Sequence, residues 1–375
     1  MAEETTIELK RAALNHYFQN LNTPQQQAVF HVNGPVLVLA GAGSGKTTAM
    51  IHRIVQMIHF GDGWVQANAS ITKEDAAYLK DYIADKQPAD LERLCSILAV
   101  QPIQPWHILA ITFTNKAANE LRSRLLQAIG EECASMLHAS TFHSACVRIL
   151  RRSISKLGYD SNFTIYDTDD SQRLMKSCIA DADVSEKQFP PRAVLTEISL
   201  AKDRMCSPEY FCIEAGSDYR KMVIGKLYKE YQNRLKSANA LDFDDLIYKT
   251  VELLESFPEE LEYYQNRFRY IMVDEYQDTN HAQFRLVQLL SQKHQNLCVV
   301  GDDDQSIYRF RGATIENILN FEKQFQNAVV IRLEQNYRST KTILEAANDV
   351  IAHNAGRKEK TLWTDLVSKM MNMRN

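Results

Sequence analysis

The sequence predicts an α/β fold in which helices cover a parallel β-sheet. Continuous apolar runs that end at polar clusters are typical of strands buried on both faces of such a sheet. Five runs have this character: Val36–Leu39, Ile108–Thr112, Tyr270–Val273, Leu297–Val300 and Val329–Leu333. Helical patterns lie between them, so strands and helices alternate along the chain, as in α/β proteins.

The helices after the first two strands are predicted from apolar spacing. One stripe in the first of them consists of Met50, Ile51, Ile54, Val55 and Ile58. Gly61 is expected to end that helix. In the second helix, Asn115 is the expected N-cap and Gly130 the expected C′ residue. Its apolar positions, spaced by four, are Leu121, Leu125 and Ile129.

Two segments interrupt the alternation. From about residue 131 to 240 the pattern is helical, with no convincing strand pairs, so we expect a mainly helical domain inserted into the α/β domain. A shorter insert lies between Gly61 and Pro105. Thr72 is expected to open one helix there, and residues 90–98 to form a second. Neither helix suggests a function for the shorter insert.

Composition places the chain among ordinary globular proteins. It has 375 residues, 45% hydrophobic and 24% charged, which is enough for two or three domains. No apolar stretch is long enough to span a bilayer, and the polar, acidic segment 1–10 does not resemble a secretory signal. The seven cysteines include no Cys-x-x-Cys pair, so we interpret them as reduced residues of a cytoplasmic protein rather than a zinc site.

The net charge of −4 argues against nonspecific coating of a polyanion. It does not exclude nucleic acid, because binding requires only a local basic surface. One candidate surface is the segment Arg148–Arg152 together with Lys156. On charge alone it could equally be a solvated helix face.

A phosphate-binding loop is predicted at residues 40–47, Ala-Gly-Ala-Gly-Ser-Gly-Lys-Thr, between a strand and a helix. Its glycines let backbone N–H groups face an anion, and the helix adds its positive end. Lys46 would contact the β- and γ-phosphates, and the Thr47 hydroxyl would bind Mg²⁺. The expected nucleotide-binding residues here are Ala42, Gly43, Ser44, Gly45, Lys46, Thr47 and Thr48. The alternative, a plain glycine-rich turn, is disfavoured by Gly-Lys-Thr and by the preceding strand.

Two carboxylates, Asp274 and Glu275, follow the strand 270–273. We expect Asp274 to bind Mg²⁺ and Glu275 to be the general base for an attacking water, the roles that phosphoryl transfer requires. Alone, the pair could be two solvated acids at a strand end. The phosphate loop makes the catalytic interpretation the better one.

The segment 301–312 also follows a strand. Gln305 could sense the γ-phosphate or the attacking water. Tyr308 and Phe310, interleaved with Arg309 and Arg311, suggest a base-stacking surface, worth about 1–3 kcal/mol per base. The alternative is a pair of core aromatic residues beside surface arginines.

Arg338 lies in a further polar segment, 333–340, after the last strand and before a helix. It could act as an arginine finger, a group worth about 10³–10⁵-fold in rate.

The order of these motifs resembles the UvrD/Rep/PcrA group of superfamily 1 DNA helicases. Eight segments match in sequence order: 21–26, 40–47, 111–118, 140–144, 241–246, 274–278, 301–313 and 335–339. The resemblance implies a RecA-like P-loop NTPase domain in two parts (1–130 and 241–328), a helical insert (131–240) and the incomplete beginning of a second RecA-like domain (329–375).

The resemblance also implies ATP and Mg²⁺ as cofactors and 3′-to-5′ movement on single-stranded DNA and its junctions with duplex, in repair or replication. It supports the roles given above for Lys46, Thr47, Asp274, Glu275, Gln305 and Arg338. Gln25 would read adenine and Tyr337 would stack on it. The implied DNA contacts are Phe113, Asn115, His143, Tyr308, Phe310 and Arg311.

The chain departs from the family pattern in three places. Thr48 replaces an arginine that often stacks on the base, and Phe310 replaces a more usual tryptophan. The pattern also fades after residues 360–364, and the later motifs of the second RecA-like domain are missing. We therefore expect nucleotide binding and some DNA affinity, with weak hydrolysis and little unwinding by this chain alone.

Several functions stay open at this point. The chain could be a helicase motor or its N-terminal part, a nucleotide-dependent DNA-binding protein without motor action, or part of a helicase–nuclease subunit. Repair or replication proteins are possible partners, and a membrane is not expected. A P-loop kinase or transporter ATPase is disfavoured by segments 308–311 and 335–338.

Overall fold

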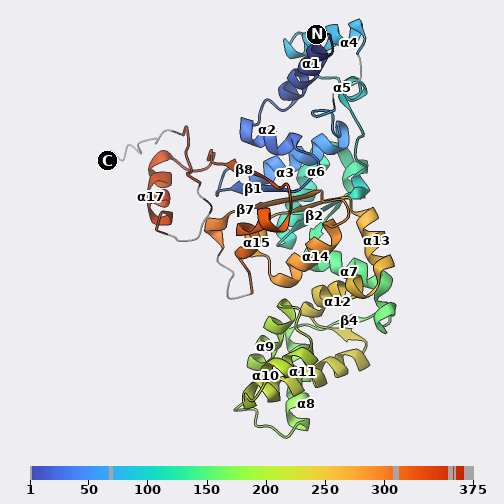
Figure 1. Ribbon diagram of the computed structural model, residues 1–375, viewed down its shortest axis with the longest axis vertical. Coiled ribbons are helices and arrows are strands. Elements are labelled where there is room, and N and C mark those ends of the chain that lie inside the picture. The colour runs from blue at the N-terminus through green and yellow to red at the C-terminus, as the bar shows by residue number, and fades with distance from the viewer. Residues whose placement is uncertain (1, 67–70, 307–311, 354–357, 359, 367–375) are drawn as a thin grey trace, which may run out of the picture.

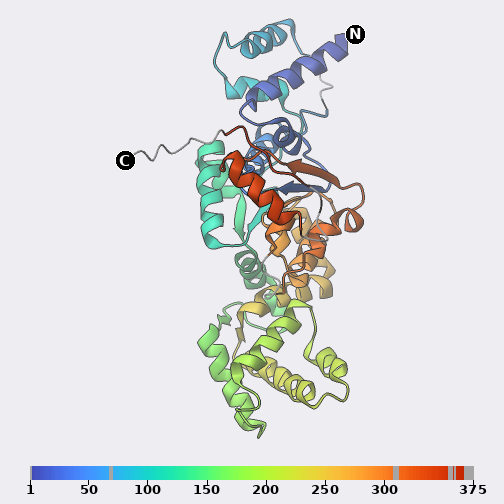
Figure 2. The same ribbon diagram turned by 90° about the vertical axis from the view of Figure 1, so that its left-hand side faces the viewer.

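The computed structural model describes residues 2–66, 71–306, 312–353, 358 and 360–366. A central sheet lies between two helical ends, so the molecule is elongated (Figures 1 and 2). One end carries the helical insert, and the other carries the N-terminal helix with the shorter insert.

The central sheet has six parallel strands in the order β3-β2-β6-β7-β1-β8. Their bounds are β1 Val36–Ala40, β2 Ile108–Thr112, β3 His138–Thr141, β6 Tyr270–Val273, β7 Leu297–Gly301 and β8 Val329–Leu333. The five predicted strands and their parallel arrangement are confirmed. Because the strands are parallel, their carboxyl ends meet at one edge of the sheet, which brings the predicted motifs together.

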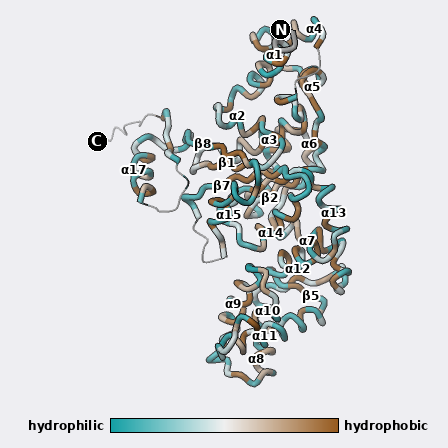
Figure 3. Tube along the Cα trace, in the orientation of Figure 1, coloured by the Kyte–Doolittle hydropathy of each residue, from teal (hydrophilic) through white to brown (hydrophobic). Residues whose placement is uncertain are grey.

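Helices cover both faces of this sheet. One face packs against α2 Thr23–Phe30, α3 Lys46–His59 and α6 Asn115–Met136. The other packs against α7 Phe142–Ser153, α12 Phe243–Ser256, α13 Pro258–Arg267 and α14 His281–Ser291. Alternate residues of β1 enter different cores: Val38 faces the first and Leu37 the second. The hydropathy trace accordingly shows its most apolar residues in the strands (Figure 3).

Two details of the helix ends differ from expectation or refine it. Thr114, not Asn115, caps α6: its hydroxyl accepts a hydrogen bond from the backbone N–H of Ala117 at 3.1 Å. Asn115 is instead the first helical residue. Gly130 breaks α6 with a φ of 79°, a left-handed conformation that suits glycine. Gly61 follows α3 as predicted, and a Cβ there would lie 2.2 Å from the carbonyl oxygen of Val100.

The helical insert has a core of its own. It contains α8 Thr168–Asp181, α9 Pro191–Asp203, α10 Pro208–Ala215 and α11 Tyr219–Ser237. The expectation of no paired strands between residues 131 and 240 was wrong. β3 belongs to the central sheet, and a short strand β4 (Thr164–Ile165) pairs with β5 (Ala240–Leu241).

The shorter insert packs against the N-terminal helix. α1 (Ala2–Tyr17) contacts α4 (Lys73–Ile83), and α5 (Leu91–Leu98) lies beside them. Both predicted helix starts are confirmed, because Thr72 and Asp90 accept capping hydrogen bonds from backbone N–H groups.

The remaining elements are connecting helices and 3-10 turns. They are the short helices α15 Glu316–Leu319 and α16 Phe321–Gln324, the helix α17 Lys341–Ile351, and the 3-10 turns η1 Pro105–His107, η2 Ile154–Leu157, η3 Tyr276–Asp278 and η4 Asp303–Gln305. β8 pairs with β1 in the same sheet. The assignment of residues 329–375 to a second domain therefore stays a prediction. In the described part of the chain, no helix is both long and apolar enough to cross a membrane.

Candidate functional site

The phosphate loop connects β1 to α3 as predicted. Gly43 and Gly45 both have positive φ, 73° and 84°, so the loop needs glycine at these positions. Gly45 is the N-cap of α3, and no side chain caps the helix. Its first N–H groups are therefore available to an anion, with the positive end of the helix behind them. The buried Ser44 hydroxyl donates to the Gly41 carbonyl at 2.8 Å and closes the turn.

The structure brings Lys46 and Glu275 together. The Lys46 ammonium lies 3.5 Å from a Glu275 carboxylate oxygen, across the gap between the phosphate loop and the end of β6. Glu275 has φ 50° and ψ 45°, a left-handed conformation that is uncommon for a residue with a side chain. Strain of this kind concentrates at functional sites.

Asp274 is buried directly after β6, and its backbone N–H donates to the Ile111 carbonyl at 2.9 Å. Burial and the neighbouring Glu275 together raise the pKa of Asp274 to about 6, although Lys46 partly offsets them. A buried carboxylate with incomplete charge compensation suits a cation. With the Thr47 hydroxyl it offers the oxygen donors that Mg²⁺ prefers, so the residues present fit the metal.

Gln277 is a site residue for which the sequence predicted no role. Its buried amide donates to Glu275 at 3.0 Å and accepts the backbone N–H of Asp302 at 2.9 Å. It therefore links the ends of β6 and β7. Gln305, the predicted γ-phosphate sensor, donates to the Asp302 carboxylate. Glu275 and Gln305 are thus parts of one hydrogen-bonded network.

The segment 335–338 lies directly against the phosphate loop. The Asn336 side chain donates to the Ala42 carbonyl at 2.6 Å, and the Tyr337 N–H donates to the Gly43 carbonyl at 2.9 Å. Asn336 also accepts the backbone N–H of Arg338 at 2.8 Å. Arg338 is exposed and its side chain begins beside the loop, because a Cβ on Gly43 would lie 2.8 Å from the Cβ of Arg338. The sequence did not indicate this role for Asn336.

The residues predicted to bind adenine lie beside the same loop. Gln25 is buried and donates to the Ser44 carbonyl at 3.0 Å, while Thr48 lies in the first turn of α3. Asn22 joins them: its amide donates to the Tyr337 hydroxyl at 2.9 Å, and it caps α2. Gln25 and Tyr337, which are 312 positions apart in the sequence, therefore lie at one end of the loop.

Three adjacent acids after β7 come close enough together to resemble a metal site. The carboxylates of Asp302, Asp303 and Asp304 lie within 4.8 Å of one another. The Lys360 ammonium sits among them, 2.7 Å from Asp302 and 2.6 Å from Asp304, and it also pairs with Asp303. An internal lysine thus supplies the positive charge, and the segment after α17 is pinned beside Gln305.

Replacing Lys360 with methionine should loosen that segment locally. Removing hydrogen bonds to charged groups costs about 1.5–3 kcal/mol. The amides that hold the segment to the end of β8, Asn336 N–H to Trp363 and Trp363 N–H to Glu334, should then exchange with solvent about 10–100-fold faster. Lys341→Met is the matched control, because Lys341 is 74% exposed and only 3.9 Å from Glu345. Equal exchange rates in both variants would contradict the pinning role.

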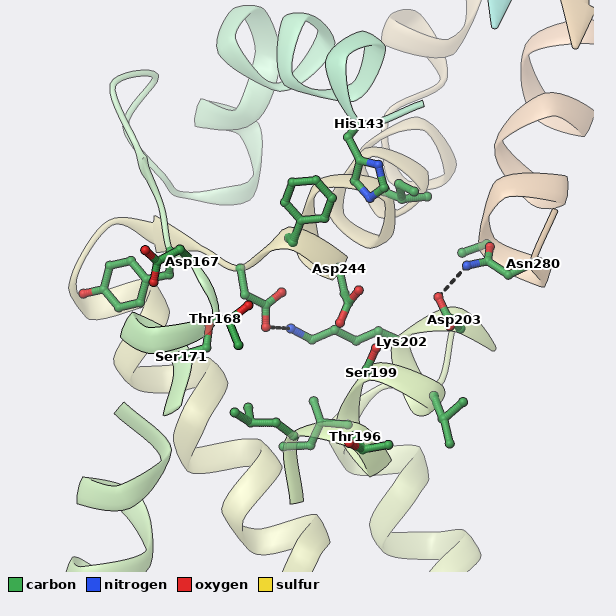
Figure 4. A pocket seen from close by; sticks show the side chains of 18 of the residues that line it. His143, Asp167, Thr168, Ser171, Thr196, Ser199, Lys202, Asp203, Asp244 and Asn280 are labelled. Atoms are coloured by element: carbon green, nitrogen blue, oxygen red, sulfur yellow. Dashed lines mark hydrogen bonds and ion pairs between the residues drawn. The ribbon is translucent and has the colours of Figure 1, made fainter. Parts of the chain in front are cut away.

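A pocket of about 710 Å³ lies between the sheet domain and the helical insert. We call it the acidic pocket, because its walls include Asp167, Asp203, Asp242, Asp244 and Asp278. Figure 4 shows carboxylates from several elements around it. Two basic side chains, Arg192 and Lys202, belong to the same lining.

Two predicted DNA-contacting residues line the acidic pocket. Phe113, after β2, and His143, in the first turn of α7, both face it. The His143 ring stacks on Phe243 with centroids 4.0 Å apart, and burial lowers the pKa of His143 to about 4, so the ring is neutral. Asn115 is exposed on α6 and is not part of the lining.

The other predicted DNA contacts, Tyr308, Phe310 and Arg311, lie outside the described residues. Their placement stays a prediction.

Asp203 at the edge of the acidic pocket gives a pH prediction. It accepts a hydrogen bond from Asn280 at 2.5 Å, and burial, with a contribution from Asp244, raises its pKa to about 7 (Figure 4). The folded state therefore holds this proton more tightly than the unfolded state, whose pKa is near 3.8. Stability from this group is present at low pH and is lost as the pH rises from about 4 to 7.

Asp203→Asn cannot ionise and should be more stable than the native chain above pH 7, by at most about 4 kcal/mol. The advantage should shrink toward zero at pH 4. Urea unfolding at several pH values measures it, with the exposed Asp160→Asn as control. A pH-independent difference would contradict the raised pKa.

The fold and this loop geometry define the class of protein, a P-loop nucleotide-binding protein with a RecA-like α/β domain. The family model described as UvrD/REP helicase N-terminal domain matches residues 21–68 and 91–326. The chain therefore belongs to the UvrD/REP helicase family, which confirms the resemblance seen in its motifs.

Relatives named ATP-dependent DNA helicase PcrA are similar over most of the chain. Identity is 47% over 351 residues with the protein of Bacillus subtilis (strain 168), and 46% over 353 residues with that of Staphylococcus aureus (strain NCTC 8325 / PS 47). Each match covers 94% of this chain and 42% of the relative. The chain thus spans less than half the length of the relatives that it matches.

Proposed function

We propose that this protein is an ATP-dependent DNA helicase that moves 3′ to 5′ along single-stranded DNA. One observation carries the proposal. A single short segment after β6 supplies Asp274 and Glu275 to the nucleotide site, and a few residues later supplies Asp278 and Asn280 to the acidic pocket. If this segment shifts when nucleotide binds, Asp278 and Asn280 would shift with it and change the acidic pocket, which Phe113 and His143 also line.

The residues present support a defined chemistry. The triphosphate would take Lys46 away from Glu275, which leaves that carboxylate able to accept a proton from water. The water oxygen then bonds to the γ-phosphorus while the bond to the β–γ bridging oxygen breaks, and ADP leaves with that oxygen. Arg338 and Gln305 would face the transferring group. Thr47 and Asp274 would hold Mg²⁺, which neutralises charge on the phosphates.

The rings of Phe113 and His143 in the acidic pocket support contacts with bases. Stacking on rings such as Phe113 and His143 tolerates any sequence, which suits a protein that moves along DNA. Single-stranded DNA and its junctions with duplex are the proposed substrates. We also propose that the protein acts in the cytoplasm together with repair or replication proteins.

The proposed domain division follows the sequence: 1–130 and 241–328 form one RecA-like domain, 131–240 the helical insert, and 329–375 the beginning of a second domain. The position of β3 in the central sheet favours moving the first boundary to a point after α7.

ATP turnover by the purified chain with and without oligodeoxythymidine tests the proposal. We expect ATP turnover to rise when single-stranded DNA is added. Phe113→Ala should reduce this stimulated turnover and leave the turnover without DNA unchanged. Translocation on strands labelled at either end then tests the 3′-to-5′ direction. Turnover that ignores DNA would contradict the proposal. DNA binding that responds to nucleotide without turnover would favour a DNA-binding protein that lacks motor action.

A further inference from the structure

A second pocket, of about 240 Å³, lies at the opposite edge of the sheet from the phosphate loop. Its lining includes His138, the first residue of β3, and Arg267, the last residue of α13. These residues lie at the amino ends of β3 and β6, whereas the nucleotide site lies at the carboxyl ends. We call this site the arginine pocket. Its other lining side chains include Arg148, Tyr263, Tyr264 and Phe268.

The arginine pocket carries positive charge without an acidic partner. Arg148 donates to the Ser140 hydroxyl at 2.8 Å, and Arg267 contacts the His138 ring nitrogen at 3.1 Å. Beside them, Arg122 donates to the Ala139 carbonyl at 2.8 Å. Within the described part of the chain, none of these three arginines forms an ion pair with a carboxylate. All the partners are neutral, so the positive charge is not compensated.

Arg148 differs in its partners from the other basic residues of the segment 148–156. Arg152 and Lys156, which the sequence grouped with Arg148, are paired with Glu260 at 3.1 and 3.2 Å. Those two residues therefore belong to a surface ion-pair network. Arg148 alone of the three is directed into a pocket. The structure thus separates a solvated part of the segment from a part that is available to a ligand.

His138 orients the arginines without adding charge. Burial, together with the nearby Arg148 and Arg267, lowers the pKa of His138 to about 4. The ring is therefore neutral near pH 7 and accepts a hydrogen bond from Arg267. Its other side packs against Phe268, with ring centroids 5.2 Å apart.

The walls of the arginine pocket are aromatic. Tyr264 and Phe268 stack with centroids 6.0 Å apart, and Tyr263 is 44% exposed. Arg152 lies 3.5 Å from the centre of the Tyr263 ring and holds it in place. Guanidinium groups match the geometry of phosphate oxygens, and exposed rings stack on bases. The volume is below the range of pockets for drug-sized ligands, so it suits one phosphate with part of its nucleotide.

We propose that the arginine pocket binds a phosphate group of a nucleotide unit, with Arg148 and Arg267 on the phosphate and Tyr263 beside the base. It is separate from the ATP site and from the acidic pocket. The phosphate could belong to a nucleic-acid strand or to a free nucleotide. Because DNA is the substrate of the proposed function, we expect the strand.

The test compares Arg148→Gln/Arg267→Gln with the matched control Arg124→Gln/Arg173→Gln, whose arginines are exposed and paired with Glu120 and Asp170. Both are made in a Lys46→Ala background, which isolates binding from the ATP site. The probes are fluorescent oligodeoxythymidine, a duplex of equal length, and AMP. Melting temperatures establish that each variant folds.

We expect the pocket variant to bind single strands at least about 10-fold more weakly than the control. Its salt dependence, the slope of log K against log salt, should fall by about 1.4 for two lost phosphate contacts. Arg148→Lys/Arg267→Lys, which keeps the charge, should retain most of that slope. A selective loss of AMP binding would support the phosphate site with a free nucleotide as its source.

Strand and AMP binding equal to the control would overturn the proposal. DNA-stimulated ATP turnover is measured separately with native Lys46. A failure of the helicase proposal and a failure of the arginine pocket are therefore distinguishable.

Discussion

Replacing Lys202 with methionine is expected to lower the free energy of unfolding by about 3–5 kcal/mol, because it leaves buried charges without a partner. The Lys202 ammonium is 1% exposed and lies 2.6 Å from Asp242 and 2.9 Å from Asp245. Burial alone would lower the pKa of Lys202, but the two carboxylates raise it, so the lysine stays charged. The Tyr231 hydroxyl also donates to Asp242 at 3.1 Å.

This cluster joins α9 of the helical insert to the start of α12, so its loss should also loosen the floor of the acidic pocket. Urea unfolding measures the effect. The control is Lys176→Met, since Lys176 and Glu186 are both 59% exposed and 3.8 Å apart. Asp245→Asn added to Lys202→Met should recover part of the lost stability, because one unpaired charge is removed. A loss below about 1 kcal/mol would contradict the description of a buried ion cluster.

Glu275→Gln is expected to slow ATP hydrolysis by about 10²–10⁴-fold while nucleotide affinity is kept. Glutamine has the same shape and can still bond to Gln277, but it cannot accept the proton of the attacking water. Single-turnover hydrolysis and equilibrium nucleotide binding separate the two effects. The control is Glu262→Gln, whose carboxylate is 66% exposed and paired with Lys293. An equal loss of affinity and rate would assign Glu275 to binding rather than to proton transfer.

The parts of the fold that the sequence predicted are those with strong local signals. The five apolar strands, the phosphate loop and the caps Thr72 and Asp90 all depend on residues close together in the chain. β3 was missed because His-Ala-Ser-Thr is not an apolar run and lies at the edge of the sheet, whereas the equally short β6 is apolar. β4 and β5 have two residues each, too few for a periodic pattern.

The roles of the expected site residues stay predictions, and the structure adds connections between residues that the sequence did not show. Gln277, Asn336 and Lys360 act through partners that are distant in sequence: Lys360 pairs with acids 56–58 positions earlier. No local pattern shows such a pairing. The acidic lining of the pocket also arises only when α8, α9 and α12 come together, so the sequence alone did not show it.

Coupling between nucleotide and DNA is the central claim, and linked binding measures it most directly. Titrating a non-hydrolysable ATP analogue with Mg²⁺ into the chain, with and without saturating oligodeoxythymidine, gives two dissociation constants. We expect them to differ, and the DNA dissociation constant should change by the same factor when the analogue is bound. Lys46→Ala should abolish the difference. Identical constants in the native chain would show that the two sites are independent and would contradict the account.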